Sequence, residues 1–296
     1  MEPIQYFPAA KAPSNPYFSI LIPSWNNLAF LQLCIRSIRE HSVVPFELIV
    51  HLNEGKDGSL EWVRDQQDIA YTHSISNVGV CHAMNAMREL AQADYLLYIN
   101  DDMYTLPGWD LLLQKEIQAC PNEYFFISST MIEPRAQSNC SIEANFGTSM
   151  DTFEEARLLA EFDTFEKADW QGATWPPNVV HKKMWDAVGG YSVEFTPGMY
   201  SDPDFSMKLW QAGVRLFKGL GQSRVYHFGS ISVKRVKQNR GYYQFIRKWG
   251  MTSSTLSKYY LRRGERFDGP LVPQKIPLFV QLKNWYYRIS TARKTI

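Results

Sequence analysis

The chain has 296 residues, 45% hydrophobic and 21% charged, which allows one large α/β domain or two modest ones and argues against a mostly disordered protein. The net charge of +1 is unevenly split: residues 224–296 hold 16 Lys and Arg against 2 Asp and Glu, a net of +14, and residues 1–223 hold 15 against 28, a net of −13. An acidic body with a basic tail predicts separate roles for the two parts.

The sequence shows no sign of a membrane-spanning or targeting segment. No run of about 18 apolar residues occurs, and the first residues lack an apolar stretch of signal-peptide length. None of the four cysteines forms a C-x-x-C pair, which argues against a zinc site built on them. We therefore expect a cytoplasmic protein with reduced thiols.

The first half of the chain alternates short apolar runs with segments of helical periodicity. Residues 1–16 hold four prolines and are expected to form an extended arm. The alternation after residue 17 predicts a Rossmann-like α/β fold, in which a mostly parallel sheet has helices on both faces. The expected strands are 18–22, 47–52, 70–74 and 95–99, and the expected helices are 28–38, 60–68 and 80–91.

The second half is less regular. It is expected to contain a strand over 124–131, then a mixed acidic segment over 133–170 and an aromatic loop over 170–177. Helical periodicity returns over 182–188 and 201–213, and one or two strands are expected within 214–229.

Polar side chains follow each of the four strands predicted in the first half. Open parallel sheets bind ligands beyond the carboxyl ends of their strands, so these side chains are expected to meet at one edge. Each of them can also be explained as a cap or a turn residue. Together they predict a pocket for a polar ligand, lined by Ser24 to Asn27, Asn53 and Glu54, Asn77, and Asp101 with Asp102.

Asp101 and Asp102 are adjacent carboxylates at the end of a predicted strand. Adjacent carboxylates repel each other unless a cation or hydrogen-bond donors neutralise them. A hard divalent ion such as Mg²⁺ or Mn²⁺ would do so and would also bind a phosphate. The alternative interpretation is a turn before Pro107 and Gly108.

Asp202 precedes Pro203, a residue that suits the first helical position, so Asp202 is expected at the N-cap. A cap would lower the pKa of Asp202 and leave it ionised at neutral pH, ready to act as a general base. The alternative is that Asp202 only caps the helix and that Asp204 complements the helix dipole.

His227 follows a predicted strand among aromatic residues, where a histidine is more often structural than a ligand. Several known motifs do not occur in the sequence. Without G-x-G-x-x-G, G-x-x-x-x-G-K-[ST] or G-x-S-x-G, a dinucleotide dehydrogenase, a P-loop NTPase and an α/β-hydrolase are all disfavoured.

In order and spacing, six segments of the chain resemble the family-two glycosyltransferases of the GT-A fold, of the type that builds bacterial surface polysaccharide and lipopolysaccharide. The resemblance covers roughly residues 17–230, with a nucleotide-binding half over 17–110, an acceptor half over 111–230 and a basic aromatic extension over 231–296. The segments are 19–26, 53–59, Asn77-Val78-Gly79 with Ala83 and Asn85, Asn100-Asp101-Asp102, Gly189-Gly190-Tyr191 with 201–205, and His227.

The resemblance implies inverting transfer of a sugar from a nucleotide donor to an acceptor hydroxyl. Asp202 would be the catalytic base, and Asp102 with His227 would hold Mn²⁺ or Mg²⁺ on the diphosphate. A UDP-sugar is the expected donor, and a glycan or a lipid-linked glycan the expected acceptor. Asp101 would lie near the ribose, and Pro23, Ser24, Asn26, Asn53 and Asn77 would line the nucleotide pocket.

The sequence departs from the family pattern at three positions. Asn53 stands where the family usually has an aspartate that contacts the base, which leaves the nucleotide open. Asn100 opens the metal motif in place of Asp, and Ser201 replaces the usual Glu.

Two other functions compete with a metal-dependent transferase. A catalytically silent carbohydrate-binding or scaffold protein on the same fold is the first alternative. A sugar-phosphate nucleotidyltransferase is discounted, because the loop after the first strand, residues 23–27, lacks the glycines that such enzymes need.

The aromatic residues Trp170, Trp175, Tyr191 and Tyr200 can form either an acceptor floor or part of the core. In the tail, apolar residues recur at helical spacing, with Lys283 and Lys294 on the opposite side. This helix is expected either to contact an anionic membrane at its inner face or to pack its apolar side on the catalytic domain. No nucleic-acid module accompanies the charge. The apolar positions are Leu278, Leu282, Trp285 and Ile289.

Overall fold

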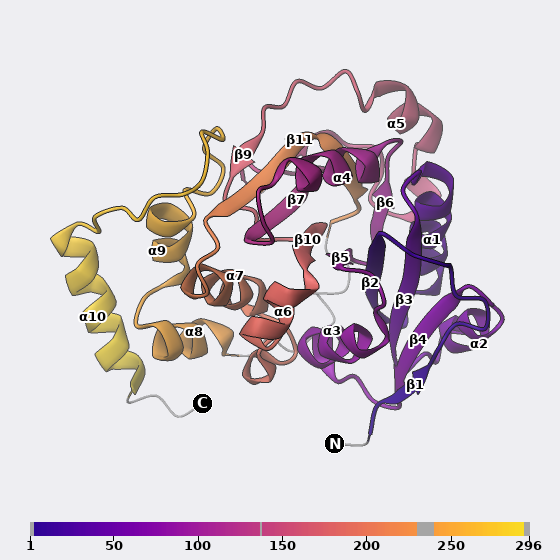
Figure 1. Ribbon diagram of the computed structural model, residues 1–296, viewed down its shortest axis with the longest axis horizontal. Coiled ribbons are helices and arrows are strands. Elements are labelled where there is room, and N and C mark those ends of the chain that lie inside the picture. Colours follow the sequence, from indigo (N-terminus) through magenta and orange to yellow (C-terminus); the bar gives the residue numbers. More distant parts are fainter. Residues whose placement is uncertain (1–2, 137, 230–239, 293–296) are drawn as a thin grey trace.

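The computed structural model describes residues 3–136, 138–229 and 240–292, and its strands join into one 11-stranded sheet (Figure 1). Along the sheet the order is β1-β4-β3-β2-β5-β10-β7-β11-β6, with β8 paired to β7 and β9 to β11. The strands are β1 (Gln5–Phe7), β2 (Phe18–Trp25), β3 (Phe46–Asn53), β4 (Ile69–Ser74), β5 (Tyr95–Tyr98), β6 (Met103–Thr105), β7 (Phe125–Glu133), β8 (Ile142–Glu143), β9 (Trp170–Gln171), β10 (Asn178–His181) and β11 (Leu216–His227).

The four strands predicted in the first half are confirmed as parallel neighbours. β2 pairs with β3 and β5, and β3 pairs with β4, all in parallel register. The crossovers between them are helices, as parallel pairing requires. These helices are α1 (Leu28–His41), α2 (Ser59–Arg64) and α3 (Gly79–Leu90).

Several elements were not predicted from the sequence, among them two short antiparallel strands and one helix. The described part of the arm includes β1, which adds an antiparallel edge strand to β4. β10 follows the expected aromatic loop and inserts antiparallel between β5 and β7. A strand of four residues is too short for a periodic pattern to identify. Helix α4 (Trp109–Ala119) was also missed.

The second half is built around β7 and β11, which run parallel over most of their length. The region expected to hold one or two strands forms the single strand β11, whose register shifts between Leu220 and Arg224. Its helices are α5 (Glu155–Glu161), α6 (Lys182–Val188), α7 (Ser201–Gln211), α8 (Gly241–Trp249), α9 (Ser253–Thr255) and α10 (Leu278–Ala292), and its short turns are η1 (Met150–Thr152), η2 (Val193–Phe195) and η4 (Leu256–Tyr260).

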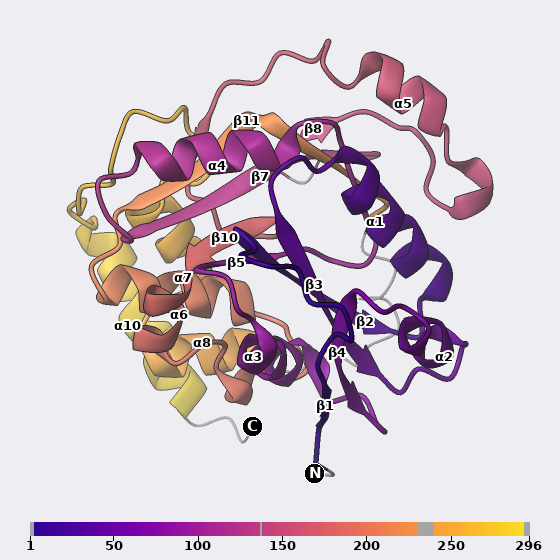
Figure 2. The same ribbon diagram turned by 45° about the vertical axis from the view of Figure 1, so that its right-hand side comes forward.

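The predicted three-layer arrangement is confirmed. Helices α1 and α4 pack on one face of the sheet with Leu31, Ile35 and Trp109 buried, and α3, α6, α7 and α8 cover the other face (Figure 2). A smaller cluster around Tyr104 and Tyr226 lies under residues 142–165. The polar strand ends therefore lie at the rim of a rigid, double-sided core.

The tail contradicts one of its two expected arrangements. Leu278 and Leu282 of α10 are 70% and 58% exposed, and Trp285 and Ile289 are exposed as well. Packing of this apolar side on the catalytic domain is therefore wrong, and the opposite side of the helix faces the protein. Lys294 lies outside the described residues. Within those residues no helix is long and apolar enough to cross a bilayer.

Candidate active site

The ends of β2 and β5 are tied together by a hydrogen bond between two predicted site residues. The Ser24 hydroxyl donates to Asp101 Oδ2 over 2.7 Å, and both side chains are buried. Pro23, just before Ser24, is half-buried within β2. This bond holds one of the two adjacent carboxylates in place and supplies part of the neutralisation that the pair needs.

Asn53 ends β3 and acts as a junction of three elements. Its amide oxygen accepts from the Val78 backbone N–H at 2.8 Å and from the Ser74 hydroxyl at 3.3 Å. Its Nδ2 donates to the Ser24 carbonyl at 3.5 Å. Because the amide oxygen already accepts two hydrogen bonds, we expect Asn53 to shape the pocket by holding these three segments in place.

Asn26 and Asn77 order the two loops on either side of this junction. Asn26 adopts φ 45° and binds both the Glu54 carboxylate, at 3.0 Å, and the Lys56 N–H, at 2.8 Å. The Asn77 side-chain oxygen accepts from Gly79 N–H at 2.8 Å, at the start of α3. Each of the predicted nucleotide-pocket residues therefore lies at the same sheet edge.

Asp102 and His227 are brought together by strand pairing. His227, the last residue of β11, is opposite Met103 of β6, so its Nε2 lies 3.5 Å from Asp102 Oδ1. On the other side, β7 ends at Glu133, whose Oε1 lies 2.8 Å from His227 Nδ1. Burial alone would lower the pKa of His227, but the Asp102 and Glu133 carboxylates raise it to about 10.

Glu133 is a residue that the sequence analysis missed. Like Asp101, it lies just after a predicted strand. Its partner His227 is 94 positions away in the chain, so nothing in the sequence indicated that the two residues meet. A carboxylate that holds one nitrogen of a histidine fixes the other nitrogen toward a metal ion in many proteins.

The residues around Asp102 suit a divalent ion bound together with a ligand. Asp102 Oδ2 is buried and has no hydrogen-bond partner in the described structure. An Asp oxygen and a His nitrogen are suitable ligands for Mn²⁺. The described residues contain no ready cluster of three His, Cys, Asp or Glu ligands, so the remaining positions would need oxygens from a ligand or water.

Asp202 lies in the first turn of α7 and is not the N-cap. The residue before the helix is Tyr200, in the left-handed region at φ 70°. The expected lowering of the Asp202 pKa is wrong: burial raises it to about 7, and the Tyr191 hydroxyl, which donates to Asp202 Oδ1 at 3.0 Å, opposes that rise. A base that titrates near neutral pH is better matched to accepting a proton than a strongly acidic carboxylate.

Tyr191 is itself held by Asn85, a residue of α3. The Asn85 amide accepts from the Tyr191 N–H and donates to the Tyr191 carbonyl, both at 2.8 Å. A Cβ on neighbouring Gly190 would meet Asn85 Oδ1 at 2.4 Å, so this glycine admits the contact. Two segments singled out separately in the sequence thus form one support for Asp202.

Asp204, two residues after Asp202, is bonded to the C-terminal extension. Its Oδ1 accepts from Trp249 Nε1 at 2.8 Å and lies 2.9 Å from Lys248 Nζ, both on α8. Asp204 is fully buried. Its carboxylate anchors α8 to α7, which favours a structural role.

Tyr98 is influenced by the carboxylates of both halves of the chain. Burial raises the pKa of this phenol well above its ordinary value, and the charges of Asp202, Asp102 and Asp101 raise it further. Tyr98 ends β5, at the centre of the sheet. The candidate base and the candidate metal ligand therefore both act electrostatically on one buried tyrosine.

The four aromatic residues weighed for an acceptor floor divide into two kinds. Trp170 and Tyr191 are buried and belong to the core. Trp175 is half-buried beneath the Arg263 guanidinium at 4.0 Å, and Tyr200 packs against Tyr242 of α8. Only the second pair has surface to offer a ligand.

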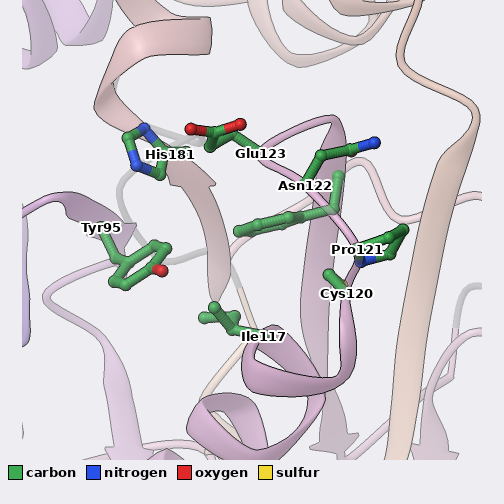
Figure 3. A pocket seen from close by; sticks show the side chains of 8 residues that line it. Tyr95, Ile117, Cys120, Pro121, Asn122, Glu123 and His181 are labelled. Carbon is green, nitrogen blue, oxygen red and sulfur yellow. The ribbon is translucent and has the colours of Figure 1, made fainter.

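A cavity of about 300 Å³ opens away from these residues, at the opposite edge of the sheet (Figure 3). Tyr95 and Phe125, the first residues of β5 and β7, line it together with His181, the last residue of antiparallel β10. Ligands of parallel sheets bind at the carboxyl ends, so this cavity is not the candidate site.

Comparison with known proteins shows relatives by sequence and by fold. Residues 19–139 match the family model "Glycosyl transferase family 2", so this segment belongs to that family, as the resemblance predicted. The chain is 31% identical over 97 residues to WcaA of Escherichia coli (strain K12), described as a colanic acid biosynthesis glycosyl transferase. That match spans 30% of this chain and 33% of WcaA, a third of the relative's length.

Solved structures of S. aureus TarS share the fold. The structure of TarS 1–349 has a TM-score of 0.56 at 12% identity, covering 93% of this chain and 71% of that one. The same fragment solved with UDP-GlcNAc gives 0.55 at 11% identity, covering 93% of this chain and 72% of that one. The predicted GT-A architecture is thereby confirmed.

Proposed function

We propose that the chain, whose residues 19–139 belong to glycosyltransferase family 2, is a metal-dependent inverting glycosyltransferase of surface-glycan synthesis. The observation that carries this proposal is the pair of carboxylates Asp202 and Asp102, whose charges, with that of Asp101, all act on the buried phenol of Tyr98. It combines a carboxylate with a near-neutral pKa and a carboxylate with an unpartnered buried oxygen. The first suits a base and the second suits a cation.

In this proposal residues 17–110 bind the donor, and 111–230 supply the base and the acceptor side. Asp102 and His227 hold Mn²⁺ or Mg²⁺, which when bound offsets charge on a diphosphate leaving group. Asp101 lies near the ribose, and Pro23, Ser24, Asn26, Asn53 and Asn77 shape the nucleotide pocket. The C-terminal extension, of which residues 240–292 are described, is anchored through α8.

Asp202 then acts on the acceptor. With a pKa of about 7, a large part of it is ionised at neutral pH and can take the proton of an attacking hydroxyl. Asn85 and Tyr191 hold the carboxylate in position. Proton removal by a fixed carboxylate on the acceptor side fits a single displacement with inversion at the sugar carbon.

A UDP-sugar is the donor that we propose. TarS structures contain UDP and UDP-GlcNAc, and those ligands belong to TarS. Asn53 occupies the position where the family usually has an aspartate that contacts the nucleobase. Its amide oxygen already accepts two hydrogen bonds from within the protein, so the identity of the nucleobase has to be measured. A glycan or lipid-linked glycan is the acceptor class.

A thermal-shift screen of UDP, GDP, CDP, ADP and TDP, with and without Mn²⁺, tests donor binding and the metal together. We expect one nucleotide to raise the Tm only when Mn²⁺ is present. A turnover assay with the matching nucleotide-sugars follows. Binding without release of nucleoside diphosphate would instead identify a silent carbohydrate-binding or scaffold protein, and a metal-independent shift would contradict the metal role.

A further inference from the structure

Helix α10 carries an apolar stripe that the described chain leaves uncovered. Six large side chains lie along one side of the helix because their spacings follow the helical repeat. All of them are well exposed, which is unusual for a contiguous set of this size. They are Leu278 at 70%, Phe279 at 69%, Leu282 at 58%, Trp285 at 62%, Tyr286 at 63% and Ile289 at 40%.

The rotation of α10 about its axis is fixed by the opposite side, which packs on α8 and α9. Val280, Asn284 and Thr291 are buried there. Asn284 Oδ1 accepts from the Thr255 hydroxyl at 3.1 Å, and Arg247 of α8 donates to the Thr291 carbonyl at 2.7 Å. The stripe therefore faces outward at the periphery of the molecule, as Figure 1 shows for α10.

Positive charge borders the stripe. Lys283 and Arg288 are exposed and lie between the apolar side and the packed side, and Lys275 precedes the helix. Within α10 there is no Asp or Glu, and residues 224–296 as a whole carry a net of +14. An exposed apolar stripe edged by cations is complementary to a surface that is anionic outside and apolar beneath.

We propose that α10 docks the protein on an anionic lipid surface. Its leucines, Phe279 and Trp285 would enter the boundary between headgroups and acyl chains, where Trp and Tyr are favoured. Lys283 and Arg288 would contact the anionic headgroups and add an electrostatic attraction that salt weakens. A second copy of the chain fits less well, because a two-fold contact would oppose these cations with no acid on the helix to offset them.

Sedimentation of the full chain with vesicles tests this proposal. The protein is expected to pellet with phosphatidylcholine–phosphatidylglycerol vesicles at low salt, to pellet much less at high salt, and to stay in solution with phosphatidylcholine alone. Failure to pellet with the anionic vesicles at low salt overturns the proposal.

The decisive variant is the double substitution Leu282→Ser with Trp285→Ser, at two exposed positions where the fold loses little. Losing two inserted side chains is expected to weaken vesicle binding by at least about tenfold. The matched control is Val43→Ser, which removes an apolar side chain that is 68% exposed between α1 and β3 and should bind like the parent. Equal binding of the double variant and the parent contradicts the proposal.

Two further measurements separate the other outcomes. If analytical ultracentrifugation shows a dimer that the double variant abolishes, the stripe is a contact between copies and the lipid proposal is wrong. Nucleotide binding by the double variant should match the parent, so the docking surface stands or falls independently of the proposed transferase activity.

Discussion

At the proposed donor end of the site, Ser24, Asn53 and Asp101 are hydrogen-bonded to other parts of the fold, and Asn77 is hydrogen-bonded to the nearby Gly79 N–H. At the catalytic end, formed by Asp102, Asp202 and His227, Asp102 has an unpartnered buried oxygen and Asp202 a raised pKa. Satisfied polar groups fix geometry, whereas a buried group left at an energetic cost is a candidate for chemistry. The comparison supports the proposal in which the donor end shapes the pocket and the catalytic end carries the chemistry.

The largest effect is expected from Asp202→Asn. The amide cannot accept the acceptor proton, so turnover should fall by about 10² to 10⁴-fold while nucleotide binding is kept. A rate near that of the parent would make Asp202 a structural residue and would remove the difference between the donor end and the catalytic end.

The same variant has a predicted signature in stability. The folded-state pKa of Asp202 is about 7, above the unfolded value of about 3.9. Ionisation therefore opposes folding, a cost that grows as pH rises between these values and is complete above 7. Asp202→Asn should raise the Tm at pH 8 and leave it unchanged at pH 3, as measured by calorimetry. A lower Tm at pH 8 would contradict the raised pKa.

Asp102→Ala should abolish the Mn²⁺-dependent part of nucleotide binding, measured by calorimetry with and without the metal, without unfolding the protein. The buried, unpartnered oxygen of Asp102 is the reason for this expectation. The matched control is Ser24→Ala at the donor end, which breaks the bond to Asp101 and should reduce stability by about 1–3 kcal/mol while Mn²⁺ still enhances binding. Equal metal responses in the two variants would remove the distinction between the ends.

Glu133→Gln tests the catalytic end more finely, because it leaves both expected metal ligands, Asp102 and His227, in place. Without the carboxylate, His227 is less firmly oriented, and Mn²⁺ affinity should fall by about 10 to 100-fold. Electron paramagnetic resonance titration of Mn²⁺ in the presence of nucleotide measures this directly. Unchanged affinity would assign Glu133 to the fold alone.

The smallest effect is expected from Tyr191→Phe. The lost hydroxyl no longer favours the ionised carboxylate, so the pKa of Asp202 should rise above 7 and the rising limb of the pH–rate profile should move to higher pH. Turnover well above that limb should be near normal. Tyr124→Phe, at an exposed tyrosine, is the control and should leave the profile where it was.

The sequence allowed the donor end to be predicted because it depends on local order. Polar residues lie at or just after the end of each parallel strand of the first half, and parallel strands bring their carboxyl ends to one edge. No geometric calculation is needed to place Ser24 near Asp101 once β2 and β5 are recognised as neighbours.

The catalytic end was less accessible to prediction because it depends on distant pairing. His227 meets Asp102 only through antiparallel β6 and β11, and Glu133 joins them only through parallel β7 and β11. The pKa of Asp202 was predicted in the wrong direction, because a helix-start pattern reports the cap and says nothing of the burial that tertiary packing imposes.

The anchoring of Asp204 by Lys248 and Trp249 has a consequence for how the protein is made. During synthesis α7 leaves the ribosome well before α8, and Trp249 lies 45 positions after the carboxylate that it covers. Until α8 arrives, the acid two residues from Asp202 is left without its cation, a charge that the finished fold buries completely. We therefore expect α7 to reach its final packing only once α8 is in place.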